Sequence, residues 1–225
     1  MEGSLAAFLT TAAITIAALL PITNPPGNAP IFLSLTRELS DEERVSMSRR
    51  VALNCLALLV VGMFGGTYIL GFFDISLPVV RVAGGLLVAA TAWRLLSTEG
   101  NAGDAPMATR YRNPSEIAGR AFYPLSFPLT VGPGSISIAI TLGASLPSRG
   151  VPLVVTALGS LAGLVTVALA IYLAYRYAPR MVRLLGESGT AVFLRLSAFI
   201  LLCIGVQICW DGFSELLAPW RAAGR

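Results

Sequence analysis

Six long runs of apolar residues constrain this chain more than any other feature of its sequence. A helix needs about 20 consecutive apolar residues to cross a bilayer, and each run is close to that length or longer. The runs cover approximately residues 5–22, 51–73, 77–96, 118–145, 151–177 and 191–213. The sequence therefore predicts an all-α, polytopic membrane protein with six transmembrane helices.

The composition excludes the common classes of soluble protein. Charged residues make up 12% of the 225 residues and hydrophobic residues 55%, whereas soluble domains carry roughly 25% charged residues. The absence of His removes the commonest metal ligand and the usual neutral-pH general base. The three Cys lie inside apolar runs, and the sequence has no catalytic or phosphate-binding motif. We therefore expect no enzyme, no metal or other cofactor, and no nucleic-acid partner.

The arginines predict how the chain is oriented. All 16 basic residues are Arg, and cytoplasmic loops of membrane proteins are enriched in basic residues. With six spans, twelve arginines fall on the side of the first, third and fifth loops: Arg37, Arg44, Arg49, Arg50, Arg94, Arg110, Arg112, Arg120, Arg176, Arg180, Arg183 and Arg195. The side of the termini has four: Arg81, Arg149, Arg221 and Arg225. We expect a multi-pass protein of the cell inner membrane with both termini facing outward, into the periplasm.

A short motif occurs twice and indicates a duplication. Residues 21–27 and 128–134 both read P-x-T-x-x-P-G. Two weaker similarities follow each copy of the motif in the same order. The first is a pair of glycines four residues apart, Gly62 and Gly66 in one half and Gly159 and Gly163 in the other, and the second is an arginine at the start of a span, Arg81 and Arg195. Three spans in each half would invert the second half relative to the first, as in many secondary transporters. We expect a single membrane domain, 1–225, with pseudo-repeats 1–96 and 118–225 joined by a cytoplasmic linker, 97–117.

Both copies of the motif interrupt an apolar run. Residues 21–30 contain four prolines and a glycine, which a helix cannot accommodate. Either the first span ends near residue 22 and a loop follows, or one span over about residues 5–39 is broken in the middle. In the fourth run, residues 124–134 contain three prolines and two glycines, and the pieces on either side are too short to cross alone. The sequence therefore predicts discontinuous helices 1 and 4, each with its break inside the membrane.

Breaks inside a membrane are tolerated only where protein or a polar cavity covers the freed backbone groups. We expect the second half-helices to begin near Asn28 and Ser135, with these residues as N-caps and with free N–H groups suited to a carboxylate. The preceding half-helices would offer carbonyls to an ammonium group, and glycines with positive φ would let a ligand approach the backbone. The candidate substrate-binding residues are Thr23, Asn24, Gly27, Asn28, Thr130, Gly132, Gly134 and Ser135. The alternative is that each polar residue only caps its own helix.

The remaining polar positions have simpler expected roles. Arg81 and Arg195 lie about one turn inside helix starts, where arginine side chains extend toward the membrane interface; a gating or substrate role is the alternative. Asn54 and Gln207 could form hydrogen bonds between helices, and the glycine pairs are expected to allow close helix packing.

Several segments resemble the MarC family of bacterial and archaeal membrane proteins. Residues 24–36, NPPGNAPIFLSLT, look like the signature of that family, and residues 124–134, PLSFPLTVGPG, resemble its second motif. Arg81 with Gly84 and Gly85, and Arg195 with Val206 and Gln207, also fit. The resemblance covers nearly the whole chain and implies six spans with both termini outside. Pro26 departs from the aliphatic residue expected there and should only stiffen the break.

The resemblance also implies a function, because some members of the family are described as transporters of small neutral amino acids such as glycine and alanine. This agrees with the pairing of N–H groups and carbonyls, which suits the two ends of a zwitterion. The leading hypothesis is a secondary transporter that moves such a substrate by alternating access, with the lipid bilayer as its other partner. The alternatives are an exporter of another small solute, a channel, or a structural membrane protein. The oligomeric state, the direction of transport and the coupling ion stay open.

The first prediction concerns topology. A C-terminal reporter that is active only in the cytoplasm should be silent when fused to this chain, because the arginine distribution puts the C-terminus outside. The measurement is reporter activity in whole cells, with fusions after residue 40 as the cytoplasmic control. Strong activity of the C-terminal fusion would contradict both the orientation and the inverted repeat.

Overall fold

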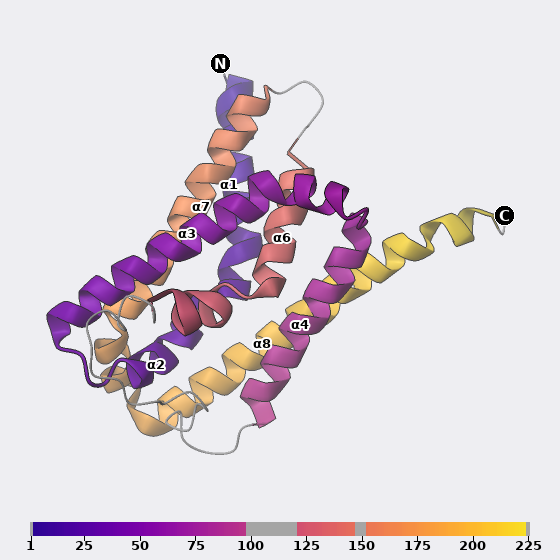
Figure 1. Cartoon of the computed structure of the whole chain (residues 1–225). Helices are drawn as coiled ribbons and strands as arrows, with labels where there is room; N and C mark the ends of the chain where they lie inside the picture. Colours follow the sequence, from indigo (N-terminus) through magenta and orange to yellow (C-terminus); the bar gives the residue numbers. More distant parts are fainter. Residues whose placement is uncertain (1, 98–120, 147–151, 224–225) are drawn as a thin grey trace.

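The computed structural model describes residues 2–97, 121–146 and 152–223, and these residues form helices without any strand (Figure 1). Beyond Ser97, the predicted linker 97–117 lies outside the described residues. The elements are α1 (Glu2–Thr23), α2 (Pro25–Leu35), α3 (Asp41–Phe72), α4 (Leu77–Ser97), η1 (Ala121–Thr130), α6 (Pro133–Ala144), α7 (Leu153–Arg176) and α8 (Ala178–Ala223).

Five of the helices are long and apolar enough to cross a membrane by themselves: α1, α3, α4, α7 and the part of α8 from Ser188 to Ala218. A sixth candidate span is the pair η1 and α6, which are bent by 70° at the break between them. The all-helical membrane architecture is therefore confirmed, with five or six candidate spans. The two short segments predicted on either side of the second break are η1 and α6.

The segment η1 is irregular because of its two prolines. Tyr123 and Phe127, which precede Pro124 and Pro128, have extended backbone angles inside a segment of wide helical turns. The ring of a proline disfavours the helical conformation in the residue before it. The chain therefore reaches the second break without a regular helix.

Helix starts and ends alternate between two sides of the molecule. In Figure 1 the start of α1, the turn between α3 and α4 and the end of α8 lie in the upper part. The turn between α2 and α3, the end of α4 and the turn between α7 and α8 lie in the lower part. This alternation is the one that six crossings require, and which side faces the cytoplasm stays a prediction.

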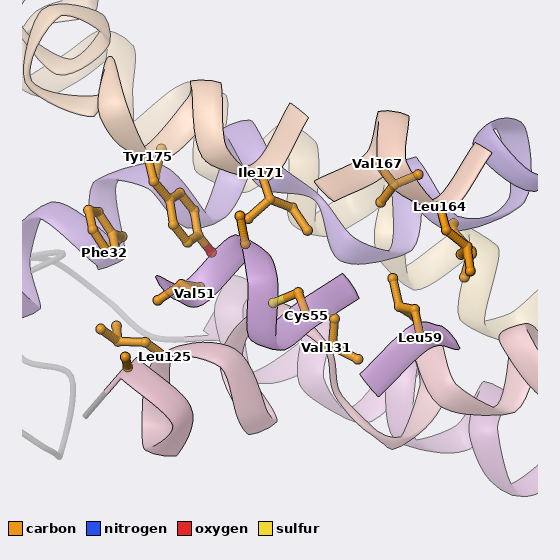
Figure 2. Packing of buried hydrophobic residues seen from close by; sticks show 14 of the residues in the cluster. Phe32, Val51, Cys55, Leu59, Leu125, Val131, Leu164, Val167, Ile171 and Tyr175 are labelled. Carbon is orange, nitrogen blue, oxygen red and sulfur yellow. The ribbon is translucent and has the colours of Figure 1, made fainter. Parts of the chain in front are cut away.

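The packing forms a ring of four helices with a helix pair beside it. Helix α7 packs on α1 and α3, and α6 packs on α3 and α1, while α4 and α8 run against each other over a long contact. The buried core lies where α1, α2, α3, η1, α6 and α7 converge (Figure 2). Large apolar side chains such as Tyr68, Phe72 and Trp93 are exposed, as expected for a surface that faces lipid.

Glycines set the close helix contacts, because lipid provides no hydrophobic force that drives one helix against another. A Cβ atom on Gly205 of α8 would lie 2.5 Å from the backbone nitrogen of Ala89 in α4. Gly62 and Gly66 pack on α6, and Gly159 and Gly163 pack on α1. The predicted packing role of the two glycine pairs is confirmed.

Two polar residues differ from their expected roles. Arg81, near the start of α4, forms an ion pair with Glu215 near the end of α8, so it has a protein partner as well as access to the interface. Gln207 donates to the carboxylate of Asp211, 2.8 Å away on the same helix, and forms no bond to another helix in the described part of the chain. Arg195 is exposed, as expected.

The second prediction tests the glycine contacts. Gly205→Ala should lower the free energy of unfolding by about 1–3 kcal/mol, the usual cost of inserting a group into a packed interface. The control is Gly65→Ala on α3, where a Cβ atom would meet nothing within 4 Å and helix propensity improves by up to about 1 kcal/mol. Thermal unfolding in detergent measures both variants, and equal melting temperatures would refute the contact.

Candidate functional site

The first break is a single residue, Asn24. Helix α1 ends at Thr23, whose hydroxyl donates to the carbonyl of Leu19 at 2.9 Å. Asn24 has φ 39° and ψ 58°, a left-handed conformation that asparagine tolerates better than most residues. Its side-chain oxygen accepts from the backbone N–H of Gly27 at 3.2 Å, and α2 begins at once with Pro25. The N-cap of the second half-helix is therefore Asn24, and the prediction of Asn28 as the cap was wrong.

The second break consists of Val131 and Gly132. Thr130 ends η1 and donates to the carbonyl of Leu125 at 2.6 Å. Helix α6 then begins at Pro133, with Gly132 in the cap position and no side-chain cap. Ser135 lies inside the first turn of α6, so the prediction that it caps this helix was also wrong.

The two breaks meet at the side chain of Asn28. Its amide nitrogen donates to the carbonyl of Thr23 at 2.9 Å and to that of Leu129 at 3.3 Å. Thr23 ends the first half-helix of one break, and Leu129 precedes the last residue of η1 at the other. Asn28 is 7% exposed, and buried carbonyls of this kind need donors. One amide therefore serves freed carbonyls of both breaks, although the residues are far apart in the sequence.

The candidate glycines do not have the predicted conformation. Gly186 in α8 is the positive-φ glycine among the described residues, so Gly27, Gly132 and Gly134 need no left-handed backbone. The side chain of Asn24 fills the space beside Gly27, and Val88 of α4 lies 2.1 Å from where a Cβ of Gly134 would be. Gly27 and Gly134 thus allow protein packing, and a Cβ on Gly132 would meet the carbonyl of Pro128 alone among the described atoms.

The start of α6 is the most open hydrogen-bonding position among the candidate residues. The helix lacks a side-chain cap, and within residues 2–97, 121–146 and 152–223 no side chain accepts from its first amides, those of Gly134 and Ser135. Ser135 is buried as a residue, with 3% of its surface exposed, and its hydroxyl has no hydrogen-bond partner among the described residues. These groups are suited to an anionic oxygen.

Tyr175, which was not predicted from the sequence, contacts the candidate residue Thr130. Its hydroxyl is 2.6 Å from the hydroxyl of Thr130, and its ring stacks on Phe32 with centroids 4.4 Å apart. Figure 2 shows the ring beside Phe32 and the hydroxyl directed into the core. A tyrosine next to an arginine at the end of an apolar run is typical of a membrane interface, and that pattern gave no sign of burial. The described residues contain no cluster of His, Cys, Asp and Glu that could hold a metal.

This arrangement defines a polytopic helical membrane protein in which two discontinuous segments meet in the core. The model of the family described as "MarC family integral membrane protein" matches residues 9–217. The chain is 31% identical over 208 residues to the inner membrane protein MarC of Citrobacter koseri, covering 90% of this chain and 94% of the relative. It is 32% identical over 213 residues to a membrane protein of Archaeoglobus fulgidus, covering 95% and 97%.

The chain therefore belongs to the MarC family of integral membrane proteins, as the motifs at residues 24–36 and 124–134 predict. No solved structure matches it.

The third prediction tests the bridge between the breaks. Asn28→Ala should lower the free energy of unfolding by about 1–3 kcal/mol, because the carbonyls of Thr23 and Leu129 lose their donor. Asn54→Ala on α3 is the matched control, since the Asn54 side chain makes no hydrogen bond within the described residues. Thermal unfolding in detergent compares the variants, and an unchanged Asn28→Ala protein would show that the bridge is dispensable.

Proposed function

We propose that this protein is a secondary transporter that moves small neutral amino acids, such as glycine and alanine, by alternating access. The substrate is held where the two broken helices meet. The observation that carries this proposal is the Asn28 amide, which joins the carbonyls of Thr23 and Leu129. It brings backbone acceptors of one break next to those of the other. The inner membrane as the location follows the names of the relatives.

The two ends of a zwitterion find suitable groups at these breaks. The carboxylate accepts from the first amides of α6 and from the Ser135 hydroxyl, which have no side-chain partner in this conformation. The ammonium group donates to the carbonyls of Thr23 and Leu129. The Asn28 amide occupies those acceptors here, so it stands in for the ammonium group and moves aside when the substrate binds.

A 3+3 inverted repeat is part of the proposal, and the pattern of helix contacts supports it. In such a repeat α1 corresponds to η1, α2 to α6, α3 to α7 and α4 to α8. The contact of α4 with α6 then corresponds to that of α8 with α2, and the contact of α1 with α7 corresponds to that of η1 with α3. All four contacts are present, and the contacts of α3 with α7 and of α4 with α8 map onto themselves. Thr23 and Thr130 both end a first half-helix and both bond back to an earlier carbonyl.

The two glycine pairs give this repeat no support. Gly62 and Gly66 pack on the second half-helix α6, whereas Gly159 and Gly163 pack on α1, a first half-helix. In an inverted repeat, both glycine pairs would pack on the same kind of half-helix.

A structural membrane protein is the second candidate, and one observation favours it. The first break is filled by its own side chains, because Asn24 caps α2 and occupies the space beside Gly27. An exporter of another small solute and a channel remain further alternatives. A carrier saturates and shows counterflow, a channel shows neither, and a structural protein binds no solute.

The fourth prediction is counterflow. Purified protein in liposomes loaded with unlabelled glycine or alanine should accumulate the labelled amino acid transiently, whereas empty liposomes should not. Ser135→Ala should raise the half-saturating concentration about fivefold, which corresponds to the loss of one hydrogen bond worth about 1 kcal/mol.

The control for this variant is Ser137→Ala, on the same helix. The Ser137 hydroxyl donates to the carbonyl of Val80 at 2.7 Å, so its removal should affect stability and leave half-saturation unchanged. Absence of counterflow with a panel of neutral amino acids would reject this substrate class. Equal effects of the two serine variants would place the substrate elsewhere.

A further inference from the structure

The side chain of Tyr175 contacts both broken segments at once. Its ring stacks on Phe32 of α2, with the ring planes 12° apart, and its hydroxyl lies 2.6 Å from that of Thr130 at the end of η1. Because Thr130 donates its own hydrogen to the carbonyl of Leu125, Tyr175 is the donor in this bond. Phe32 and Tyr175 are completely buried. One side chain on α7 therefore links the second half-helix of the first break to the first half-helix of the second.

This contact lies between the breaks and one end of the molecule. Phe32 is one helical turn further along α2 than Asn28, and so further from the first break. Tyr175 is the second to last residue of α7, beside the turn at which α8 begins. Val51 and Leu125 are buried in the same cluster as the two rings, and Figure 2 shows all four side chains in one part of the core. Buried side chains therefore fill the core between the breaks and the turns that follow α2 and α7.

We propose that Tyr175 is a positioning residue that clamps the two helix breaks together, and that its release from Thr130 and Phe32 opens the site toward the end of the molecule formed by the turns after α2 and α7. This rests on the transport function proposed above and names the residue that couples the two broken segments. Alternating access requires one broken segment to move relative to the other. Since Tyr175 holds both, neither α2 nor η1 can separate from α7 while its two contacts persist.

The chain contains its own reporter for this opening. Cys55 on α3 is completely buried, and its thiol lies near the hydroxyls of Ser126 and Thr130. The other two cysteines, Cys203 and Cys209, lie on α8. Replacing both by Ser leaves a full-length chain whose single thiol lies directly beside the clamp.

The fifth prediction is the rate at which Cys55 reacts in this background. Membrane vesicles of both orientations are treated with a small, membrane-impermeant methanethiosulfonate that carries a trimethylammonium group. Tyr175→Phe keeps the ring on Phe32 but loses the hydroxyl, and it should raise the rate about tenfold. This corresponds to about 1.4 kcal/mol, within the range for one buried hydrogen bond. The rise should appear only when the reagent is added from the side of the turns that follow α2 and α7.

Two further variants separate a clamp from general loosening. Tyr172→Phe is the matched control, because Tyr172 lies on the same helix and its hydroxyl bonds to Arg176; its rate should equal that of the parent. Thr130→Val removes the acceptor of the Tyr175 bond and should raise the rate as Tyr175→Phe does. The double variant should show no additional increase, because both changes remove the same bond.

The possible results decide between the proposals. Unchanged labelling in both Tyr175→Phe and Thr130→Val, an equal rise in Tyr172→Phe, or a rise from both sides overturns the clamp. Counterflow by the parent protein together with unchanged labelling rejects the clamp alone. One-sided labelling without counterflow of any amino acid supports the clamp and rejects the proposed substrate class.

Discussion

The architecture of this protein depends on how two interrupted helices satisfy their backbone carbonyls away from water. Inside a bilayer no solvent is available for such groups, so each must find a donor within the protein. The Asn28 amide supplies donors to Thr23 at one break and to Leu129 at the other. This requirement draws α2 against η1 and explains why segments about a hundred residues apart in the chain lie side by side. Helix α2 also packs on α7 and α8, and η1 packs on α3.

The helices around this centre pack closely through small residues. At Gly205, Gly143 and Gly163, the position of a Cβ atom lies within 3 Å of atoms on the neighbouring helix. In a membrane, such close approach replaces the hydrophobic force that would hold helices together in water. The long contact between α4 and α8 is also joined by the ion pair of Arg81 and Glu215. The broken segments are therefore held between rigid, closely packed helices.

Hydropathy and proline placement predicted most of the fold, because both act locally. Apolar runs gave the spans, and the prolines at 124 and 128 correctly marked an irregular segment before the second break. The N-cap of α2 was predicted at the wrong residue because Asn24 and Asn28 are both residue types that cap helices. The left-handed backbone conformation of Asn24 makes it the cap. Tyr175 and Glu215 could not be found, since their partners, Thr130 and Arg81, are distant in the sequence. Which face of a helix meets which neighbour is a property of the assembled packing.

The two breaks share a motif but differ in how completely the protein satisfies them. At the first, the Asn24 side chain accepts from Gly27 and fills the space beside it, so α2 begins with its N-terminus already occupied. At the second, Gly132 has no side chain to offer, and the first amides of α6 and the Ser135 hydroxyl have no side-chain partner within the described residues. An anion therefore gains more at the second break, because it displaces no existing cap there. In the transporter that we propose, this difference would fix the substrate in one orientation, with its carboxylate at α6 and its ammonium group at the carbonyls that Asn28 occupies.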